Sequence, residues 1–115
     1  MDCVFCKIAR KEIPADIVYE DDDIIAFRDA HPIAPVHILL IPKKHIESIA
    51  DITKQDTLLM GKLIVTAKKI ASDLKISEKG YKLLFRVGEH GGQEVGHIHL
   101  HLIGGARLRE DIHSV

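Results

Sequence analysis

Apolar residues fall into short blocks along the chain, and their spacing predicts a strand pair in the N-terminal third. Residues 16–20 and 24–29 are rich in apolar positions and flank the acidic run 20–23. Four consecutive carboxyl side chains between two apolar segments are typical of a solvated turn, so this region predicts a β-hairpin. Upstream of the hairpin, residues 4–12 predict a short helix that Pro14 stops.

The middle of the chain predicts a central strand followed by a long helix. Residues 36–42 are apolar at almost every position, which is typical of a strand buried on both faces, and His37 is the polar exception that needs a partner. Two prolines in residues 31–35 indicate a loop before this strand. Residues 53–75 predict a helix that covers the sheet, a partner subunit, or both. Its apolar stripe consists of Met60, Leu63, Ile64, Ala67, Ile70, Ala71 and Leu74.

The C-terminal part of the chain predicts a second hairpin. Residues 81–87 and 95–103 form its strands, and the glycine-rich segment 88–92 connects them. Strands, then one long helix, then two more strands indicate an α+β fold. We expect a five-stranded antiparallel sheet with one long and one short helix, in a single domain of residues 1–115.

Three histidines alternate with apolar residues in the last predicted strand. Side chains two positions apart share one face of a strand, so His97, His99 and His101 line one face while the apolar residues between them point into the core. Neighbouring imidazoles then lie roughly 6.5–7 Å apart along the strand, close enough to converge on one phosphate or one metal. Histidine also suits proton transfer and metal binding at neutral pH, so this face is the candidate site.

The histidines allow three kinds of chemistry. His99 can be a nucleophile toward phosphorus, with proton-carrying imidazoles beside it and glycine-rich backbone N–H groups approaching the phosphate. All three histidines can bind a catalytic zinc, although the first and third lie roughly 13 Å apart on a strand, which disfavours this site. Alternatively, Cys3 and Cys6 join two histidines in a structural Cys2His2 set.

Composition and charge narrow the class of protein. The chain has 115 residues, of which 46% are hydrophobic and 29% charged, with a formal net charge of -1, as in ordinary globular proteins. A duplex DNA binder carries a basic excess, so we expect no nucleic-acid partner. No apolar run is long enough for a membrane span, and the start has no signal-peptide pattern, so we expect a cytoplasmic location. Two cysteines in a reducing compartment favour a metal or redox role.

The ordered set of motifs resembles the histidine-triad family, named for the pattern His-φ-His-φ-His-φ-φ in which φ is apolar. Within that family it is most similar to the Hint branch of small nucleotide hydrolases and transferases. The similarity covers nearly the whole chain. It rests on F-C-K-I at 5–8, K-E-I-P at 11–14, A-F-R-D at 26–29, A-P-V-H-I-L-L-I-P-K-K-H at 34–45 and G-G-Q-E-V-G-H-I-H-L-H-L-I-G-G at 91–105.

The resemblance implies a role for each matching residue. It makes His99 the nucleophile that takes the nucleotidyl group through its α-phosphorus, and it makes His101 and His37 the imidazoles that contact phosphate and manage protons. Asp29 matches the residue that hydrogen-bonds the ribose hydroxyls, and Gln93 matches a loop residue near the phosphate and the scissile bond. The residues that match the apolar base pocket are Val4, Phe5, Ile8, Ile13 and Phe27.

The resemblance also implies a structural zinc site. Zinc-bearing relatives use a C-x-x-C pair, a histidine after P-K-K and the first triad histidine, which are here Cys3, Cys6, His45 and His97. Such a zinc pins the N-terminal segment to the sheet. The resemblance implies no cofactor for catalysis itself, because imidazoles and backbone N–H groups meet the phosphate charge.

The implied activity is hydrolysis of the P–N bond of a purine nucleoside 5′-phosphoramidate through a nucleotidyl-histidine intermediate, by a homodimer. The alternatives are a diadenosine polyphosphate hydrolase, a nucleotide-binding interaction module without turnover, and a catalytic-zinc hydrolase. Three features depart from the family pattern: Arg86 stands where many relatives carry Asn, Glu94 where some carry Ser, and the tail 106–115 lacks a Trp-Pro-Pro ending. The tail and Glu94 bear on the leaving group, whereas Arg86 either grips a phosphate with two hydrogen bonds or points outward. His90 and His113 lie outside every motif, and we expect both to be exposed.

Overall fold

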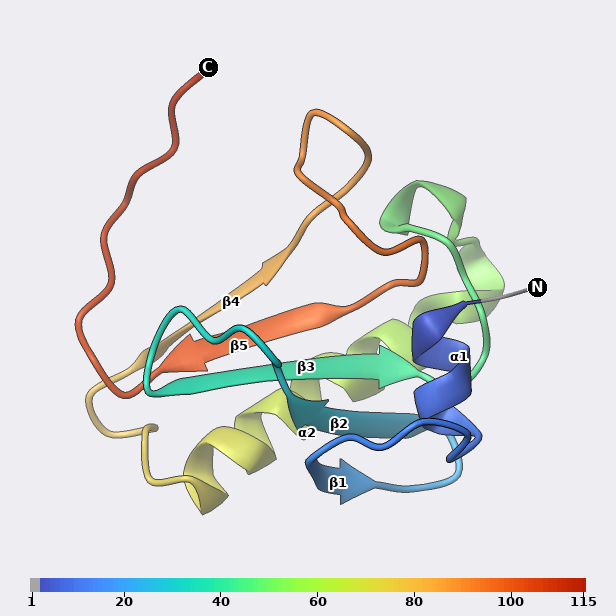
Figure 1. Cartoon of the computed structure of the whole chain (residues 1–115), viewed down its shortest axis with the longest axis horizontal. Helices are drawn as coiled ribbons and strands as arrows, with labels where there is room; N and C mark the ends of the chain where they lie inside the picture. Colours follow the sequence, from blue (N-terminus) through green and yellow to red (C-terminus); the bar gives the residue numbers. More distant parts are fainter. Residues whose placement is uncertain (1–2) are drawn as a thin grey trace.

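A computed structural model describes residues 3–115 as one sheet with a helix on each side (Figure 1). Met1 and Asp2, which enter the expectation about a signal peptide, lie outside the described residues. None of the described helices is long and apolar enough to cross a membrane. The elements are α1 (Val4–Ala9), β1 (Ile17–Glu20), β2 (Ile24–Arg28), β3 (Val36–Pro42), the 3-10 turns η1 (Ile49–Asp51) and η2 (Lys54–Asp56), α2 (Thr57–Asp73), β4 (Tyr81–Phe85) and β5 (Leu100–Gly104).

The sheet has the strand order β1-β2-β3-β5-β4, and every neighbouring pair is antiparallel. This arrangement confirms the predicted α+β fold with five antiparallel strands, one long helix and one short helix. β3 and β5 lie at the centre, and β1 and β4 are the edge strands. The sheet therefore brings the histidine of β3 next to those of the β5 segment, although they are separated by about half of the chain.

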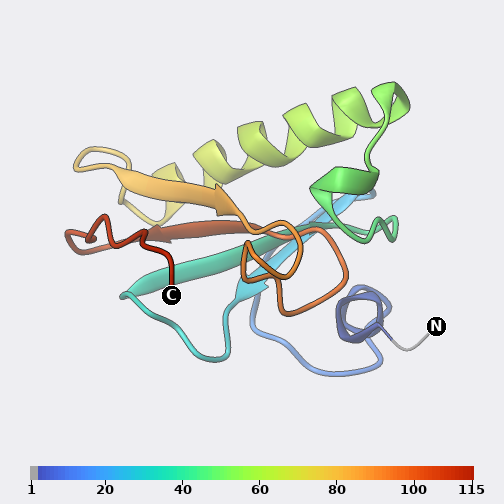
Figure 2. The same ribbon diagram turned by 90° about the horizontal axis from the view of Figure 1, so that it is seen from above.

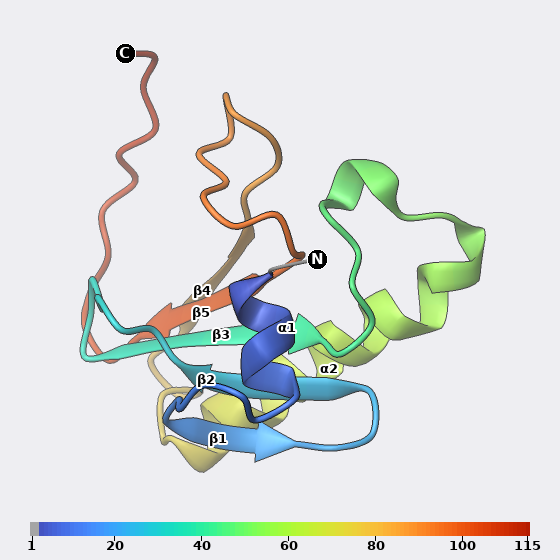
Figure 3. The same ribbon diagram turned by 45° about the vertical axis from the view of Figure 1, so that its right-hand side comes forward.

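The two faces of the sheet are covered by different helices (Figures 2 and 3). Ile38 and Leu40 of β3 pack in the core beneath α2, whereas Leu39 and Ile41 pack in a second core with α1. Because both faces are covered, β3 is apolar along nearly its whole length, as predicted. The odd-numbered histidines near β5 lie on the α1 face, since Leu100 and Leu102 belong to the α2 core.

The predicted helices are correct in kind, but their limits differ. The first helix ends at Ala9, before Pro14, because Arg10 caps it and Lys11 takes a left-handed conformation with φ of 63°. The long helix begins at Thr57 because residues 54–56 form a 3-10 turn, which the side chains of Thr53 and Asp56 close with a capping box. Ile64 of the predicted apolar stripe is 50% exposed and lies outside the core beneath α2.

In the second hairpin, both strands are shorter than predicted on the side of the connecting loop. β4 stops at Phe85, and β5 begins at Leu100, five residues after the predicted start. Residues 95–97 bend, and the segment bonds outside the sheet: the His97 N–H donates to the Val95 carbonyl, and the Ile98 N–H donates to the Ile46 carbonyl. Two of the three aligned histidines therefore precede the strand.

Candidate active site and metal cluster

The α1 face of the sheet gathers five polar side chains from three chain segments. His97 and His99 approach β5, His101 lies on β5, and His37 lies on β3, while Asp29 follows β2. The Asp29 N–H donates to the His37 carbonyl, which keeps these two residues side by side. All four histidines are at most 8% exposed. The residues predicted for phosphate and ribose contact therefore lie together.

The protonation of His99 is set by its own segment of backbone. Its Nδ1 lies 2.7 Å from the His97 carbonyl oxygen, which can only accept, so Nδ1 carries the proton. In the neutral imidazole the lone pair is then on Nε2. No hydrogen bond from residues 3–115 engages Nε2, so this atom is available as a nucleophile.

His37 and His101 form a hydrogen-bonded chain that ends in an unused donor. The Ile33 N–H lies 3.3 Å from Nδ1 of His37, so that nitrogen accepts and Nε2 carries the proton. Nε2 of His37 lies 2.9 Å from Nδ1 of His101, which must accept, so His101 carries its proton on Nε2. That Nε2 is buried and has no partner within residues 3–115. An orphaned buried donor beside a nucleophile is a ready contact for a substrate oxygen.

Burial keeps these imidazoles neutral. Burial, together with the neighbouring His99, His37 and Arg86, lowers the pKa of His101 to about 4. Burial also lowers the pKa of His37, against the carboxylate of Asp29, whose Oδ2 lies 3.4 Å from Nε2 of His37. At neutral pH each group in this series therefore donates to the next: the Ile33 N–H donates to His37, and His37 donates to His101. The Nε2–H of His101 is left to donate into the site.

This depressed pKa predicts a pH-dependent stability. The unfolded chain binds a proton on His101 near its usual pKa of about 6.5, whereas the folded chain resists it until about 4. Stability is therefore full above pH 6.5 and falls as the pH drops toward 4. Between pH 7 and pH 5, we expect the free energy of unfolding to fall by on the order of 2 kcal/mol more in the wild type than in His101→Gln, as measured by urea unfolding. Equal pH dependence in the wild type and the variant would contradict this assignment.

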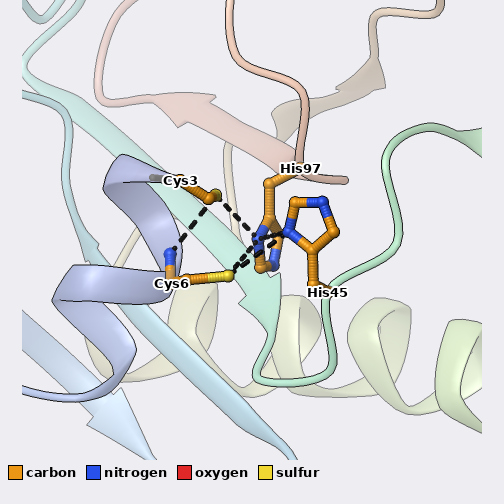
Figure 4. A group of neighbouring side chains, drawn as sticks. All are labelled: Cys3, Cys6, His45 and His97. Atoms are coloured by element: carbon orange, nitrogen blue, oxygen red, sulfur yellow. Dashed lines mark hydrogen bonds between the residues drawn. The ribbon is translucent and has the colours of Figure 1, made fainter. Parts of the chain in front are cut away.

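A second cluster lies at the N-terminal end of α1 (Figure 4). Cys3 and Cys6 from the first turn of α1 meet His45, which follows β3, and His97. Nδ1 of His97 lies 3.3 Å from Sγ of Cys3, 3.6 Å from Sγ of Cys6 and 3.2 Å from Nδ1 of His45. Sγ of Cys6 also lies 3.3 Å from Nδ1 of His45. The four donor atoms thus converge on one point.

The donor set fits a tetrahedral zinc ion. Tetrahedral Zn–S and Zn–N bonds place neighbouring ligand atoms about 3.3–3.6 Å apart, which these contacts match. His97 has its other nitrogen, Nε2, 2.7 Å from the Pro42 carbonyl oxygen, so Nε2 holds the proton and Nδ1 offers its lone pair. Burial and the nearby Cys3 raise the pKa of the Cys6 thiol, so binding of a metal cation would release a proton from this pair.

Comparison with known proteins decides the family. The HIT domain family matches residues 10–108. This chain is a histidine-triad (HIT) protein. It is 49% identical to a purine nucleoside phosphoramidase of Escherichia coli K12 over 107 residues, covering 93% of this chain and 90% of the relative.

Solved structures of histidine-triad proteins share this fold closely. A HIT family hydrolase from Legionella pneumophila is 52% identical, with a TM-score of 0.93 over 95% of this chain and 97% of the neighbour. A histidine triad protein from Clostridium difficile is 43% identical, with a TM-score of 0.94 over 97% of each chain. Cys3 and Cys6 precede the residues that the family matches, so the metal cluster extends beyond the HIT domain itself.

The apolar residues proposed to line the base pocket of this HIT protein form packed core. The ring of Phe5 meets those of Phe27 and His99 edge-on, with centroids 5.4 Å and 5.1 Å apart. Phe5, Ile8 and Phe27 are buried in the core beneath α1, Ile13 packs at its margin, and Val4 is partly exposed. Of these side chains, Phe5 contacts the ring of His99 directly.

The loop before the triad is held by its own hydrogen bonds. The Gly88 N–H donates to Oε1 of Gln93, and Nε2 of Gln93 donates to the carbonyls of Glu47 and Val95. The Gly92 and Gln93 N–H groups are also used within the loop. The expectation that glycine-rich N–H groups are free for phosphate is thus wrong for these three donors, since Gln93 fixes the loop shape. Glu94 is exposed at its end.

Several groups that shape the site escaped the sequence analysis. The carbonyls of Pro42 and His97 and the N–H of Ile33 fix which nitrogen of each imidazole carries the proton. They are backbone atoms, so no side-chain pattern marks them. His90 and His113 are exposed, as predicted.

Proposed function

We propose that this protein hydrolyses the P–N bond of purine nucleoside 5′-phosphoramidates through a nucleotidyl-histidine intermediate. One observation carries the proposal: Nε2 of His99 is unprotonated because Nδ1–H is bonded to the His97 carbonyl, and the free Nε2–H of His101 lies on the neighbouring imidazole of the same face. A nucleophile and a donor for the phosphoryl oxygen are thus already in place. The similarity to an E. coli purine nucleoside phosphoramidase supports the reaction class.

The reaction has two steps. In the first, Nε2 of His99 bonds to phosphorus, the P–N bond breaks, and the leaving amine takes a proton from the medium. The imidazole then carries a positive charge, which the His97 carbonyl stabilises through Nδ1–H. In the second step a water oxygen bonds to phosphorus, the Nε2–P bond breaks, and the water proton passes to the medium. His101 donates its Nε2–H to a phosphoryl oxygen in both steps.

The remaining site residues hold the nucleotide. Asp29 accepts from the ribose hydroxyls beside His37, and the wall formed by Phe5, Ile8 and Phe27 contacts the purine. Gln93 holds the loop beside the phosphate site through its hydrogen bonds to backbone groups, and the exposed Glu94 follows it in the chain.

The test compares two substrate classes with the purified protein. We expect release of AMP from adenosine 5′-phosphoramidate with a kcat/KM at least tenfold above that for diadenosine tetraphosphate, as the similarity to a purine nucleoside phosphoramidase suggests. A reversed preference would assign the protein to polyphosphate hydrolysis. Tight AMP binding without turnover of either substrate would make it a binding module.

We also propose that Cys3, Cys6, His45 and His97 hold a structural zinc ion. The support is the distance of 3.2–3.6 Å between the donor atoms and the Pro42 carbonyl that leaves Nδ1 of His97 free. The zinc would tie α1 to the sheet and takes no part in the steps above. Both cysteines are free thiols. Such thiols persist in a reducing compartment, so we place the protein in the cytoplasm.

The outer face of α2 supports a homodimer. Leu58, Ile64 and Val65 expose 88%, 50% and 68% of their surface, and β4 is an edge strand that exposes Leu83. Exposed apolar groups of this size are typical of an interface. We expect a mass near twice that of one chain in light scattering, and Val65→Glu to yield monomers, while Arg10→Glu at the end of α1, on the other side of the sheet, leaves the mass unchanged. A monomeric wild type would contradict the dimer.

A further inference from the structure

The register of the sheet places a cation on the side of the histidines opposite to Asp29. Leu84 of β4 is the partner of His101 of β5, and Arg86 directly follows the end of β4, next to the start of β5. Asp29 instead adjoins His37 at the β2 side. Across the sheet the order is therefore Asp29, His37, the β5 histidines and then Arg86.

Arg86 has no partner of its own. It makes no hydrogen bond or ion pair with residues 3–115, and its side chain is exposed. In contrast, many surface cations are paired with carboxylates, among them Arg10, Lys11, Arg28, Lys43, Lys44, Lys62, Lys69 and Lys82. An unpaired guanidinium at a site for anionic substrates is available to bind charge.

The Arg86 side chain lies along the loop that closes the site. Its Cδ and Nη1 atoms lie 3.8 Å from the position that a Cβ on Gly92 would occupy. Its positive charge also lowers the pKa of both His37 and His101, so its field reaches the imidazoles. Arg86 is thus close to the reacting centre, although its position in the chain precedes the triad by more than ten residues.

A substrate that spans the α1 face places its leaving group near Arg86. With the ribose at Asp29 and phosphorus at His99, the next group along the substrate extends toward β4. We propose that Arg86 is a specificity-determining residue that binds an anionic group on the leaving amine. The preferred substrates would then be nucleoside 5′-phosphoramidates of acidic amines, in which a carboxylate or a further phosphate supplies the charge. This inference rests on the phosphoramidase activity proposed above.

The test compares three adenosine 5′-phosphoramidates whose leaving amines differ in charge. Glycine supplies a carboxylate, 2-aminoethyl phosphate supplies a phosphate, and glycinamide is the neutral match of glycine. We expect the wild type to prefer the anionic amines, and Arg86→Gln to lower kcat/KM about tenfold for these and less than twofold for glycinamide. The two anionic arms decide whether carboxylate or phosphate is the better ligand. The control Arg28→Gln removes an equal charge from the opposite face and should leave the preference intact.

Binding separates this inference from the proposed reaction. The dissociation constants of the same three compounds are measured in His99→Ala, with and without Arg86→Gln, so turnover is not needed. A preference for anionic amines that Arg86→Gln removes supports the inference, even if the wild type hydrolyses none of them. Equal losses for all three compounds, or no preference in the parent, would overturn it, because Arg86 would then act on the shared phosphoryl group or on nothing.

Discussion

Replacing His99 with alanine is expected to lower the rate of AMP release from adenosine 5′-phosphoramidate by at least about 10³-fold. The reason is that Nε2 of His99 is the group assigned to bond with phosphorus, and no other imidazole nitrogen of the site has a lone pair free of hydrogen bonds or the metal cluster. The measurement is steady-state release of AMP. A rapid quench of the wild type should also trap an acid-labile nucleotidyl-protein that the variant lacks.

The control for this variant is His90→Ala, which removes an exposed imidazole from the neighbouring loop and should keep full activity. His99 makes its one hydrogen bond with the backbone, so the alanine variant should fold, and its circular dichroism should match that of the wild type. Turnover within tenfold of the wild type in a folded His99→Ala protein would exclude the covalent route.

Removal of the metal is expected to lower the midpoint of thermal unfolding by roughly 10–20 °C. α1 has only six residues, too few for a stable helix in isolation. Its attachment depends on Phe5 and Ile8 in the core and on Cys3 and Cys6 in the cluster. The measurement is calorimetry with and without a chelator, together with the metal content of the protein as purified.

The matched pair for the metal test is His45→Gln and His90→Gln. The first removes a ligand of the cluster and should make the midpoint insensitive to chelator, whereas the second removes an exposed histidine and should keep the full shift. If the purified wild type contained less than a tenth of an equivalent of metal and its midpoint did not respond to chelator, the structural zinc site would be wrong.

The apolar pattern predicted the central strand correctly, but the alternating pattern of residues 95–99 wrongly predicted a strand where the chain bends. The limits of β3 agree with the prediction because its apolar run is bounded by a proline-rich loop and by Pro42. The alternation of residues 95–103 correctly indicates which side chains share a face. It does not indicate pairing, and the Ile98 N–H in fact donates to Ile46, outside the sheet.

The site was predictable as a set of side chains, but its proton positions were not. Residue types and spacing led to His99 and His101, the resemblance to the histidine-triad family added His37, and the structure brings the three together. The direction of each hydrogen bond depends on backbone atoms of Ile33 and His97, which the fold alone positions. The sequence also did not predict that Arg86 lacks an ion-pair partner among residues 3–115, because a sequence does not show which cations pair with carboxylates.

His97 uses two separate parts of one residue for two separate purposes. Its ring faces the cysteine cluster, while its carbonyl oxygen holds the proton of His99. A shift of this residue by a failed metal site would therefore move the acceptor that keeps the nucleophile in its reactive tautomer. A genetic selection for inactive protein should then recover substitutions at Cys3, Cys6 and His45 alongside those at His99. Such mutants would share a phenotype, and only suppression by added metal salts would tell the two groups apart.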